Sequence, residues 1–136
     1  MEFAYTRSTG PVVGAFLTGL RDRRVLGAKD SLGRVVVPPP EYDVQTADAT
    51  DAAALVEVSH EGVVTSWSWN PLPRAGQPFD RPFAWALVKL DGADTSLLHA
   101  LDAPADQIST GQRVRIRWAD ETRGFIDDIA CFEVVA

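Results

Sequence analysis

Apolar residues recur at two different periods along the chain, and the period changes just after Arg23. Before that point the apolar residues stand three and four positions apart: Val12, Val13, Phe16, Leu17 and Leu20. This spacing predicts a short amphipathic helix from Gly10 to about Arg23, for which Pro11 is a favourable first-turn residue. Beyond it, short runs of β-branched or alternating apolar residues predict strands.

A hairpin is predicted directly after the helix. Its strands are Val25–Ala28 and Arg34–Val37, and the polar turn Asp30–Gly33 lies between them. Three prolines, Pro38–Pro40, end the second strand because proline cannot donate a ladder hydrogen bond. From Glu41 to Ala54 the chain is acidic, rich in small residues and without apolar periodicity, which predicts a surface loop.

Five short strands are predicted in the rest of the chain. They are Gly62–Trp69, Phe83–Leu90, Ser96–Leu101, Arg113–Trp118 and a last strand within Gly124–Val135. A brief helical turn is predicted at 103–111, between the third and fourth strands. Five strands in this order, with one helical element at this place, are typical of an OB-fold barrel. The sequence therefore predicts a mainly β protein with an N-terminal helix and hairpin in residues 1–54 and a five-stranded OB-fold barrel in residues 55–136.

Composition and charge exclude several classes of protein. The chain has 136 residues, of which 46% are hydrophobic, enough for one domain with a core and a small appendage. Its net charge of −6 argues against a nucleic-acid binder, because affinity for phosphate backbones depends on clustered Lys and Arg. No apolar run approaches the roughly 18 residues of a membrane span, and the N-terminus lacks a signal-peptide layout. A single cysteine, Cys131, allows no internal disulfide, so a reducing cytoplasm is the simplest setting.

Few residues offer chemistry that this chain could perform alone. His99 has Asp102 three positions later, but this spacing puts the two side chains on opposite faces of a strand. A core or rim histidine is therefore expected. Cys131 has apolar neighbours and is expected to be a buried, unreactive thiol. The sequence contains no G-x-S-x-G motif, P-loop or dinucleotide-binding fingerprint. No catalytic residue is predicted.

Two groups of arginines are candidates for binding anions. The first lies on one face of a predicted strand: Arg113, Arg115 and Arg117. The second follows the helix: Arg21, Arg23 and Arg24. Because guanidinium groups bind phosphates well, either group is a candidate for the phosphates of coenzyme A. The ordinary alternatives are a solvated strand face for the first group and compensation of the helix dipole for the second.

Aromatic residues gather around the proline-rich segment 71–82. Alternation along the preceding strand places one set of side chains on a single face, with the tryptophans toward the barrel interior: Val63, Thr65, Trp67 and Trp69. A small barrel has limited room, so other aromatic side chains are expected outside, where they favour a protein interface. A purely structural role is the open alternative. With the exposed-looking face of the helix, the predicted partner interface comprises Phe16, Leu20, Trp67, Trp69, Leu72, Phe79, Arg81, Phe83 and Trp85.

The predicted hairpin has the outline of a zinc ribbon without its ligands. In a zinc ribbon one C-x-x-C pair stands at the turn and a second pair follows the next strand. Residues 25–54 contain neither Cys nor His. The sequence therefore predicts no bound metal.

The whole chain resembles the OB-fold, acyl-CoA-associated family, in which a helix leads into a rubredoxin-like zinc ribbon and then a barrel. The resemblance is carried by FLTGLRDRRVLGAKDSLGRVVVPP for the helix and ribbon, and by GVVTSWSW, PFAWALVKLDG and ISTGQRVRIRW for the barrel. It extends from Phe16 to Val135. Typical members have cysteines at both knuckles, whereas Lys29 and Leu32 stand at the first pair here and residues 41–45 at the second.

This departure resembles a narrower branch of the family, which serves bacterial steroid side-chain degradation. The matching stretches are YTRSTGPVVGAFLTGLRDRRVLGAKDSLGRVVVPPPEYD and PFAWALVKLDGADTSLLHALD. The resemblance implies a non-catalytic subunit that forms a hetero-oligomer with a thiolase-like (lipid-transfer-protein) aldolase. That complex would cleave a steroid side-chain acyl-CoA by a retro-aldol reaction, releasing a steroid ketone and propionyl-CoA. Coenzyme A would enter as the thioester substrate, and no cofactor is expected on this chain.

Two alternatives stay open. The same resemblance allows a partner domain of a MaoC-like enoyl-CoA hydratase in the same pathway. The other alternative is a free-standing OB-fold module that binds an oligonucleotide or another ligand, although the acidic charge weighs against an oligonucleotide.

Overall fold

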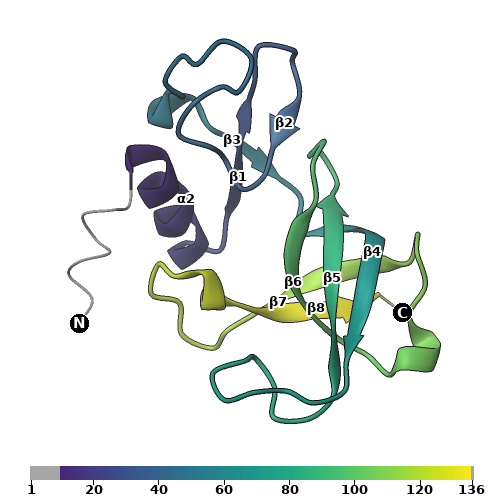
Figure 1. The fold of residues 1–136 in the computed structure, drawn as a ribbon. Coiled ribbons are helices and arrows are strands. Elements are labelled where there is room, and N and C mark those ends of the chain that lie inside the picture. The colour runs from purple at the N-terminus through teal and green to yellow at the C-terminus, as the bar shows by residue number, and fades with distance from the viewer. Residues whose placement is uncertain (1–9, 136) are drawn as a thin grey trace.

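Two sheets organise the chain, a small three-stranded sheet beside a helix and a closed five-stranded barrel (Figure 1). The structure is a computed structural model and describes residues 10–135. The first nine residues of the predicted unit 1–54, including the start of the stretch that begins at Tyr5, lie outside the described residues. Within residues 10–135, no helix has the length and apolar character needed to cross a membrane.

Helix α2 spans Pro11–Arg21, within the predicted range. Its apolar stripe packs against strand β1, Val25–Lys29, and joins the main core. Phe16 and Leu20 are both buried in this contact. The prediction that they form an exposed docking face is therefore wrong. An amphipathic helix is expected to bury its apolar face, but the pattern does not say against what. Here the rest of the same chain buries it.

The start of α2 is capped by a residue from a distant loop. Gly10 offers no side-chain cap, and the carboxylate of Glu41 accepts hydrogen bonds from the N–H groups of Val12 (3.2 Å) and Val13 (2.8 Å). A Cβ atom on Gly10 would collide with this carboxylate. Glu41 thus satisfies two free donors at the positive end of the helix dipole.

The end of α2 is held by an unusual arginine. Arg23 has the left-handed φ of 58° at the position where a helix commonly ends in glycine. The N–H groups of Arg23 and Arg24 close the last turn with hydrogen bonds of 2.9 and 2.8 Å to helix carbonyls. The Arg23 side chain donates to the carbonyls of Ala119 (3.2 Å) and Asp120 (3.1 Å), which ties the helix to a barrel loop.

The small sheet has the order β2-β1-β3 and contains one strand that was not predicted. Strand β2 is Val35–Val36, and β3 is Val56–Val58, which pairs antiparallel with β1. A three-residue strand is too short to show a periodic pattern. The predicted loop before it includes a short 3-10 helix, Ala52–Ala54.

The outer edge of β2 is bound to the barrel. The N–H of Val35 donates to the Asp94 carboxylate, and the N–H of Val37 donates to the Thr95 hydroxyl, both at 2.8 Å. The Thr95 hydroxyl in turn donates to the carbonyl of Val37 (3.1 Å). These bonds satisfy an edge that would otherwise be free to pair with another strand.

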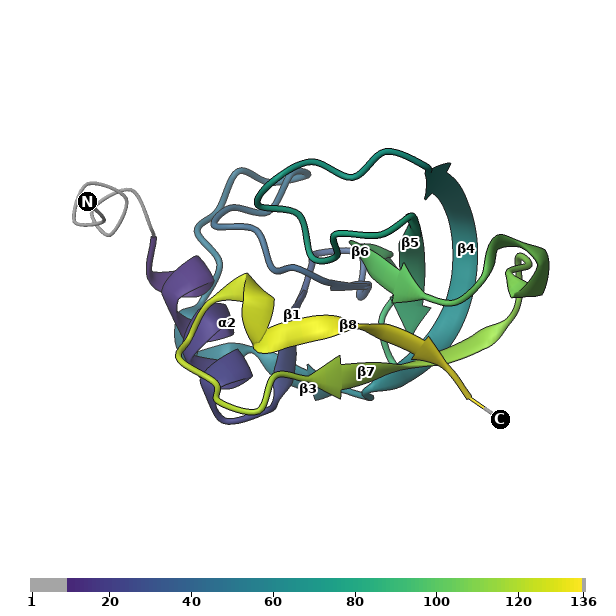
Figure 2. The ribbon, with the colours of Figure 1, turned by 90° about the horizontal axis from the view of Figure 1, so that it is seen from below.

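The barrel confirms the predicted OB-fold. Its strands are β4 (Glu61–Asn70), β5 (Phe83–Leu90), β6 (Leu97–Asp102), β7 (Arg113–Trp118) and β8 (Ile129–Val134). They close in the order β4-β5-β6-β8-β7, and only β6 and β8 pair in parallel. The short helix Ala105–Gln107 lies between the third and fourth barrel strands, as predicted. Seen from below, helix α2 lies beside the loop that joins β7 to β8 (Figure 2).

A β-bulge changes which residues of β4 face the interior. The pairing register shifts between Val64 and Ser66, so that Val64 and Trp67 lie opposite buried residues of β5. Val63 and Thr65 therefore do not share a face with Trp67 and Trp69, contrary to the prediction. One extra residue in a strand reverses the alternation beyond it.

Candidate functional site

The aromatic residues around the proline-rich loop build a second, small core outside the barrel. Phe83 is fully buried, and the rings of Phe79 and Trp85 pack edge-on against it, with centroids 5.5 and 5.0 Å away. Ala100 and Cys131 complete the cluster. Phe83 therefore offers no surface to a partner, and the prediction that it is an interface residue is wrong because the loop folds back over the sheet.

The remaining predicted interface residues have mixed surroundings. Arg81 lies over the ring of Phe79 at 4.5 Å and donates a 2.8 Å hydrogen bond to Asp102. Trp67 and Trp69 are half-buried against the main core. Leu72 is 81% exposed and lines a shallow depression of about 480 Å³ between Trp69 and Trp85. The proline-rich loop thus keeps one strongly exposed apolar residue of the predicted set.

The strand arginines face carboxylates at every position. Arg113 donates to Asp91 at 2.9 and 2.7 Å and to Glu61 at 3.3 Å. Arg115 is paired with Glu133, and Arg117 is paired with Asp102 and Glu133. Hydrogen bonding to Arg113 lowers the pKa of Asp91, and the bond to Asp102 raises the pKa of Arg117. Three guanidinium groups meet four carboxylates here, so the row has no surplus positive charge, and the geometry favours the ordinary interpretation of a solvated, charge-paired face.

The second group of arginines is also engaged within the chain. Arg21 lies 3.9 Å from Asp22, and Arg24 lies 3.2 Å from Glu57. The Arg23 guanidinium is held by the two loop carbonyls described above. Arg23 therefore has a structural role at the end of the helix, whereas Arg21 and Arg24 form exposed ion pairs that contribute little to stability.

His99 and Cys131 are both buried, as predicted. The Nδ1 atom of His99 accepts a hydrogen bond from the N–H of Ala100 (2.7 Å), while Asp102 binds the arginines on the outer face. Burial lowers the pKa of His99, although hydrogen bonding to the backbone of Ile126 acts in the opposite direction. Burial raises the pKa of the Cys131 thiol to about 11, so it is protonated at neutral pH. Neither residue has the exposure or partner of a catalytic group.

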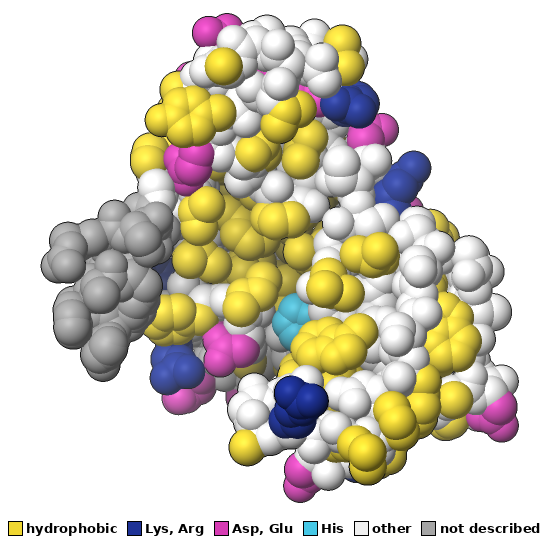
Figure 3. Space-filling view, viewed as in Figure 1, with side chains coloured by type: hydrophobic (Ala, Val, Ile, Leu, Met, Phe, Trp, Pro, Cys, Tyr) yellow, Lys and Arg dark blue, Asp and Glu magenta, His cyan; other side chains and the backbone are white. Residues whose placement is uncertain are grey.

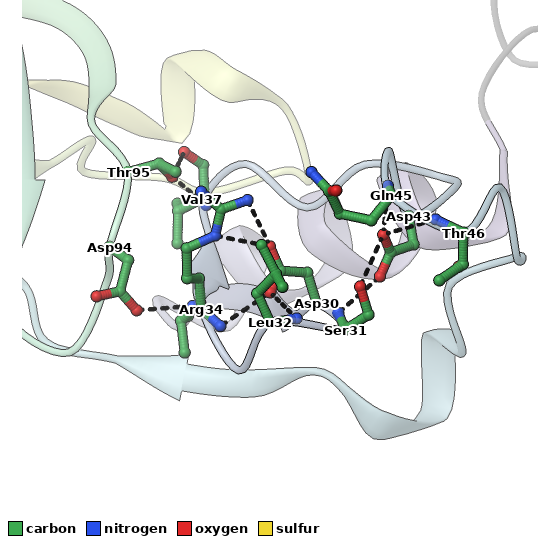
Figure 4. A network of polar contacts seen from close by, with 11 residues as sticks. Asp30, Ser31, Leu32, Arg34, Val37, Asp43, Gln45, Thr46, Asp94 and Thr95 are labelled. Carbon is green, nitrogen blue, oxygen red and sulfur yellow. Dashed lines mark hydrogen bonds and ion pairs between the residues drawn. The ribbon is translucent and has the colours of Figure 1, made fainter.

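Carboxylates organise two loops next to the small sheet, the turn 30–34 between β1 and β2 and the loop 41–50, which we call the two loops of the ribbon (Figure 4). Asp30 accepts hydrogen bonds from the N–H groups of Leu32 and Arg34, each at 2.9 Å. Asp43 accepts from the N–H groups of Gln45 and Ser31, each at 2.7 Å, and so connects the second loop to the first. These bonds lower the pKa of Asp43. In residues 10–135, no group of three or more His, Cys, Asp or Glu side chains is placed to hold a metal ion.

Apolar side chains project from the same two loops, and sequence reasoning did not single out this surface. We name it the ribbon tip, and it consists of Leu32 (62% exposed), Tyr42 (63%) and Val44 (80%). The space-filling view shows hydrophobic and acidic side chains together over this end of the molecule, at the top (Figure 3). The available signal in the sequence was two apolar residues, Tyr42 and Val44, within an otherwise acidic and small-residue loop.

Comparison with known proteins finds one matching family model and solved structures with a similar fold. Residues 55–119 match the family model described as the C-terminal OB-fold domain of ChsH2. No curated protein matches the chain. A chain of the Ltp2-ChsH2(DUF35) aldolase has a similar structure, with a TM-score of 0.64 and 21% identity over 88% of this chain and 91% of that one. A protein of unknown function from the DUF35 family of Sulfolobus solfataricus is similar with a TM-score of 0.63 and 24% identity, over 85% of this chain and 84% of that one.

At these identities the two solved structures show a common fold over most of this chain. The family model adds sequence evidence for residues 55–119, which include four of the five barrel strands. Residues 55–119 are thus similar in sequence to the C-terminal OB-fold domain of ChsH2.

Proposed function

We propose that this chain is a non-catalytic subunit that partners a thiolase-like aldolase. The observation that carries the proposal is the fold shared over about nine-tenths of both chains with a component of the Ltp2-ChsH2(DUF35) aldolase. The buried positions of His99 and Cys131, the two side chains considered for catalysis, also support a partner role.

The reaction proposed for the complex is retro-aldol cleavage of a steroid side-chain acyl-CoA. The carbon–carbon bond between the carbinol carbon and the α-carbon of the thioester breaks, giving a steroid ketone and propionyl-CoA. The aldolase subunit would supply the base and the groups that polarise the thioester carbonyl. This chain contributes by binding and stabilising that subunit, in the cytoplasm, and holds no cofactor of its own.

Co-expression with the thiolase-like aldolase of the same organism tests the proposal. We expect the two chains to co-elute from a size-exclusion column and the complex to release propionyl-CoA from a steroid β-hydroxyacyl-CoA. Full solubility and full activity of the aldolase without this chain would reject the proposal. A parallel pull-down with a MaoC-like hydratase tests the alternative partner, and binding to the hydratase alone would favour it.

A further inference from the structure

The ribbon tip exposes apolar surface at one place that the rest of the chain does not cover. Single exposed apolar residues are common on protein surfaces, whereas a group of them marks a contact site. Leu32 follows Ser31 directly, and Tyr42 and Val44 flank Asp43. The 2.7 Å hydrogen bond from Ser31 to Asp43 therefore holds the three apolar residues at the same end of the small sheet.

The loops that carry the ribbon tip are held in one shape. Tyr42 pairs with Ala49 in an isolated β-bridge, and the N–H of Asp43 donates to the carbonyl of Asp48 at 2.9 Å. The carboxylates of Asp30 and Asp43 satisfy the N–H groups of the turns on both sides. A surface that is ordered before it binds loses less conformational entropy on association.

An acidic pocket of about 230 Å³ lies beside the ribbon tip. Its apolar lining includes Val36 and Leu55, and three carboxylates without an ion pair among the described residues line it as well: Asp43, Asp48 and Asp51. Lys29 is the one cationic residue in its lining. A pocket with apolar walls and surplus negative charge suits the aliphatic stem and cationic head of a Lys or Arg side chain.

We infer that the ribbon tip is the docking surface for the aldolase subunit, whose contacting surface is apolar and inserts a Lys or Arg side chain into the adjacent acidic pocket. This inference rests on the proposed function. Charge complementarity with the carboxylates of the pocket selects a partner that presents a Lys or Arg side chain beside its apolar contact surface. The two docking surfaces suggested by the sequence are less suited to this role, because the helix face is buried and the proline-rich loop keeps only Leu72 as a strongly exposed apolar residue.

Affinity for the purified aldolase, measured with the full chain at about 150 mM salt, tests the inference. We expect Val44→Ser and Leu32→Ser to raise the Kd about tenfold or more, as for central interface residues. Asp48→Lys is expected to lower the association rate, because it reverses charge at the pocket. Leu98→Ser is the matched control, since Leu98 is 58% exposed on a barrel strand and is expected to change the Kd less than about twofold.

The outcomes distinguish a wrong docking surface from a wrong partner. If the unaltered chain binds the aldolase and the ribbon-tip variants bind equally well, the inference is rejected and the proposed function stands. Loss of affinity in Leu72→Ser alone would also reject it, in favour of the proline-rich loop. Failure of the unaltered chain to bind would reject both proposals. A photoreactive amino acid in place of Val44 is expected to cross-link to the aldolase, and one in place of Leu98 is not.

Discussion

The backbone N–H of Ser31 donates a 2.7 Å hydrogen bond to the carboxylate of Asp43, and this bond joins the two loops of the ribbon. In a zinc ribbon the metal makes that connection through four ligands. Here the same carboxylate also accepts a hydrogen bond from Gln45, within its own loop. A single side chain thus fixes both loops relative to each other (Figure 4).

Replacing Asp43 by Asn is expected to loosen the link between the loops and to remove its dependence on pH. Hydrogen bonding lowers the pKa of Asp43 below its ordinary value of 3.8. The contribution of the ionised Asp43 carboxylate to the stability of the folded state is therefore complete above pH 3.8. It is lost as the pH falls through the lower pKa that Asp43 has in the folded state. The amide resonances of Ser31 and Gln45 should titrate with a midpoint below 3.8 in the unaltered chain and not in Asp43→Asn. If the two amide resonances titrate in Asp43→Asn as they do in the unaltered chain, another group controls them. Asp48→Asn is the control variant and should keep the titration of the unaltered chain.

The purified chain is expected to hold no stoichiometric zinc. The family resemblance puts Lys29 and Leu32 at the positions of the first ligand pair, and neither side chain is a zinc ligand in this setting. Elemental analysis of protein purified without chelator measures this directly. One zinc per chain would contradict the interpretation of the ribbon and of the Asp43 link.

Arg23→Ala is expected to lower the free energy of unfolding by about 1–2 kcal/mol, because it removes two hydrogen bonds between the helix and the barrel loop. Arg23→Gly loses the same bonds but relieves the left-handed backbone at φ 58°, so it should cost about 1 kcal/mol less than the alanine variant. Urea unfolding of the two variants gives the comparison. Equal stability of the two would show that the backbone at this position is not strained.

Phe83→Ala is expected to lower the free energy of unfolding by about 3–5 kcal/mol, since Phe83 is the centre of the small outer core. It should also expose Cys131 and raise its rate of reaction with a thiol reagent about tenfold. Phe83→Leu keeps an apolar side chain and should give an intermediate result if the alanine variant does not fold. Phe125→Ala, at a half-exposed position, is the control, and equal effects at both sites would argue against an outer core.

Thr95→Val is expected to weaken the attachment of the small sheet to the barrel. The substitution preserves shape but leaves the N–H and carbonyl of Val37 without their partner, at a cost of about 1–3 kcal/mol. Hydrogen exchange at the amide of Val37 should accelerate more than exchange in the barrel strands. Thr110→Val, at an exposed position, is the control and should leave the stability and the exchange rate of Val37 unchanged. Slow exchange of the Val37 amide in the Thr95 variant would contradict this account.

Local sequence patterns determined much of this fold, because periodicity reports which faces of a helix or strand are apolar. The helix before β1, the five barrel strands and the short helix between the third and fourth followed from these patterns. The burial of His99 and Cys131 also followed from their apolar neighbours. Strand β3 did not, because a three-residue segment shows no period.

Only the tertiary structure decided what covers each apolar face and what neutralises each charge. Phe16 is buried by the same chain, and Phe83 points away from the barrel interior yet lies under the folded proline-rich loop. Arg117 meets a carboxylate fifteen positions away, and Asp43 connects two loops across twelve positions. Spacing along the sequence fixes the direction of a side chain within its own helix or strand. The partner that meets it comes from distant parts of the chain, which only packing brings together.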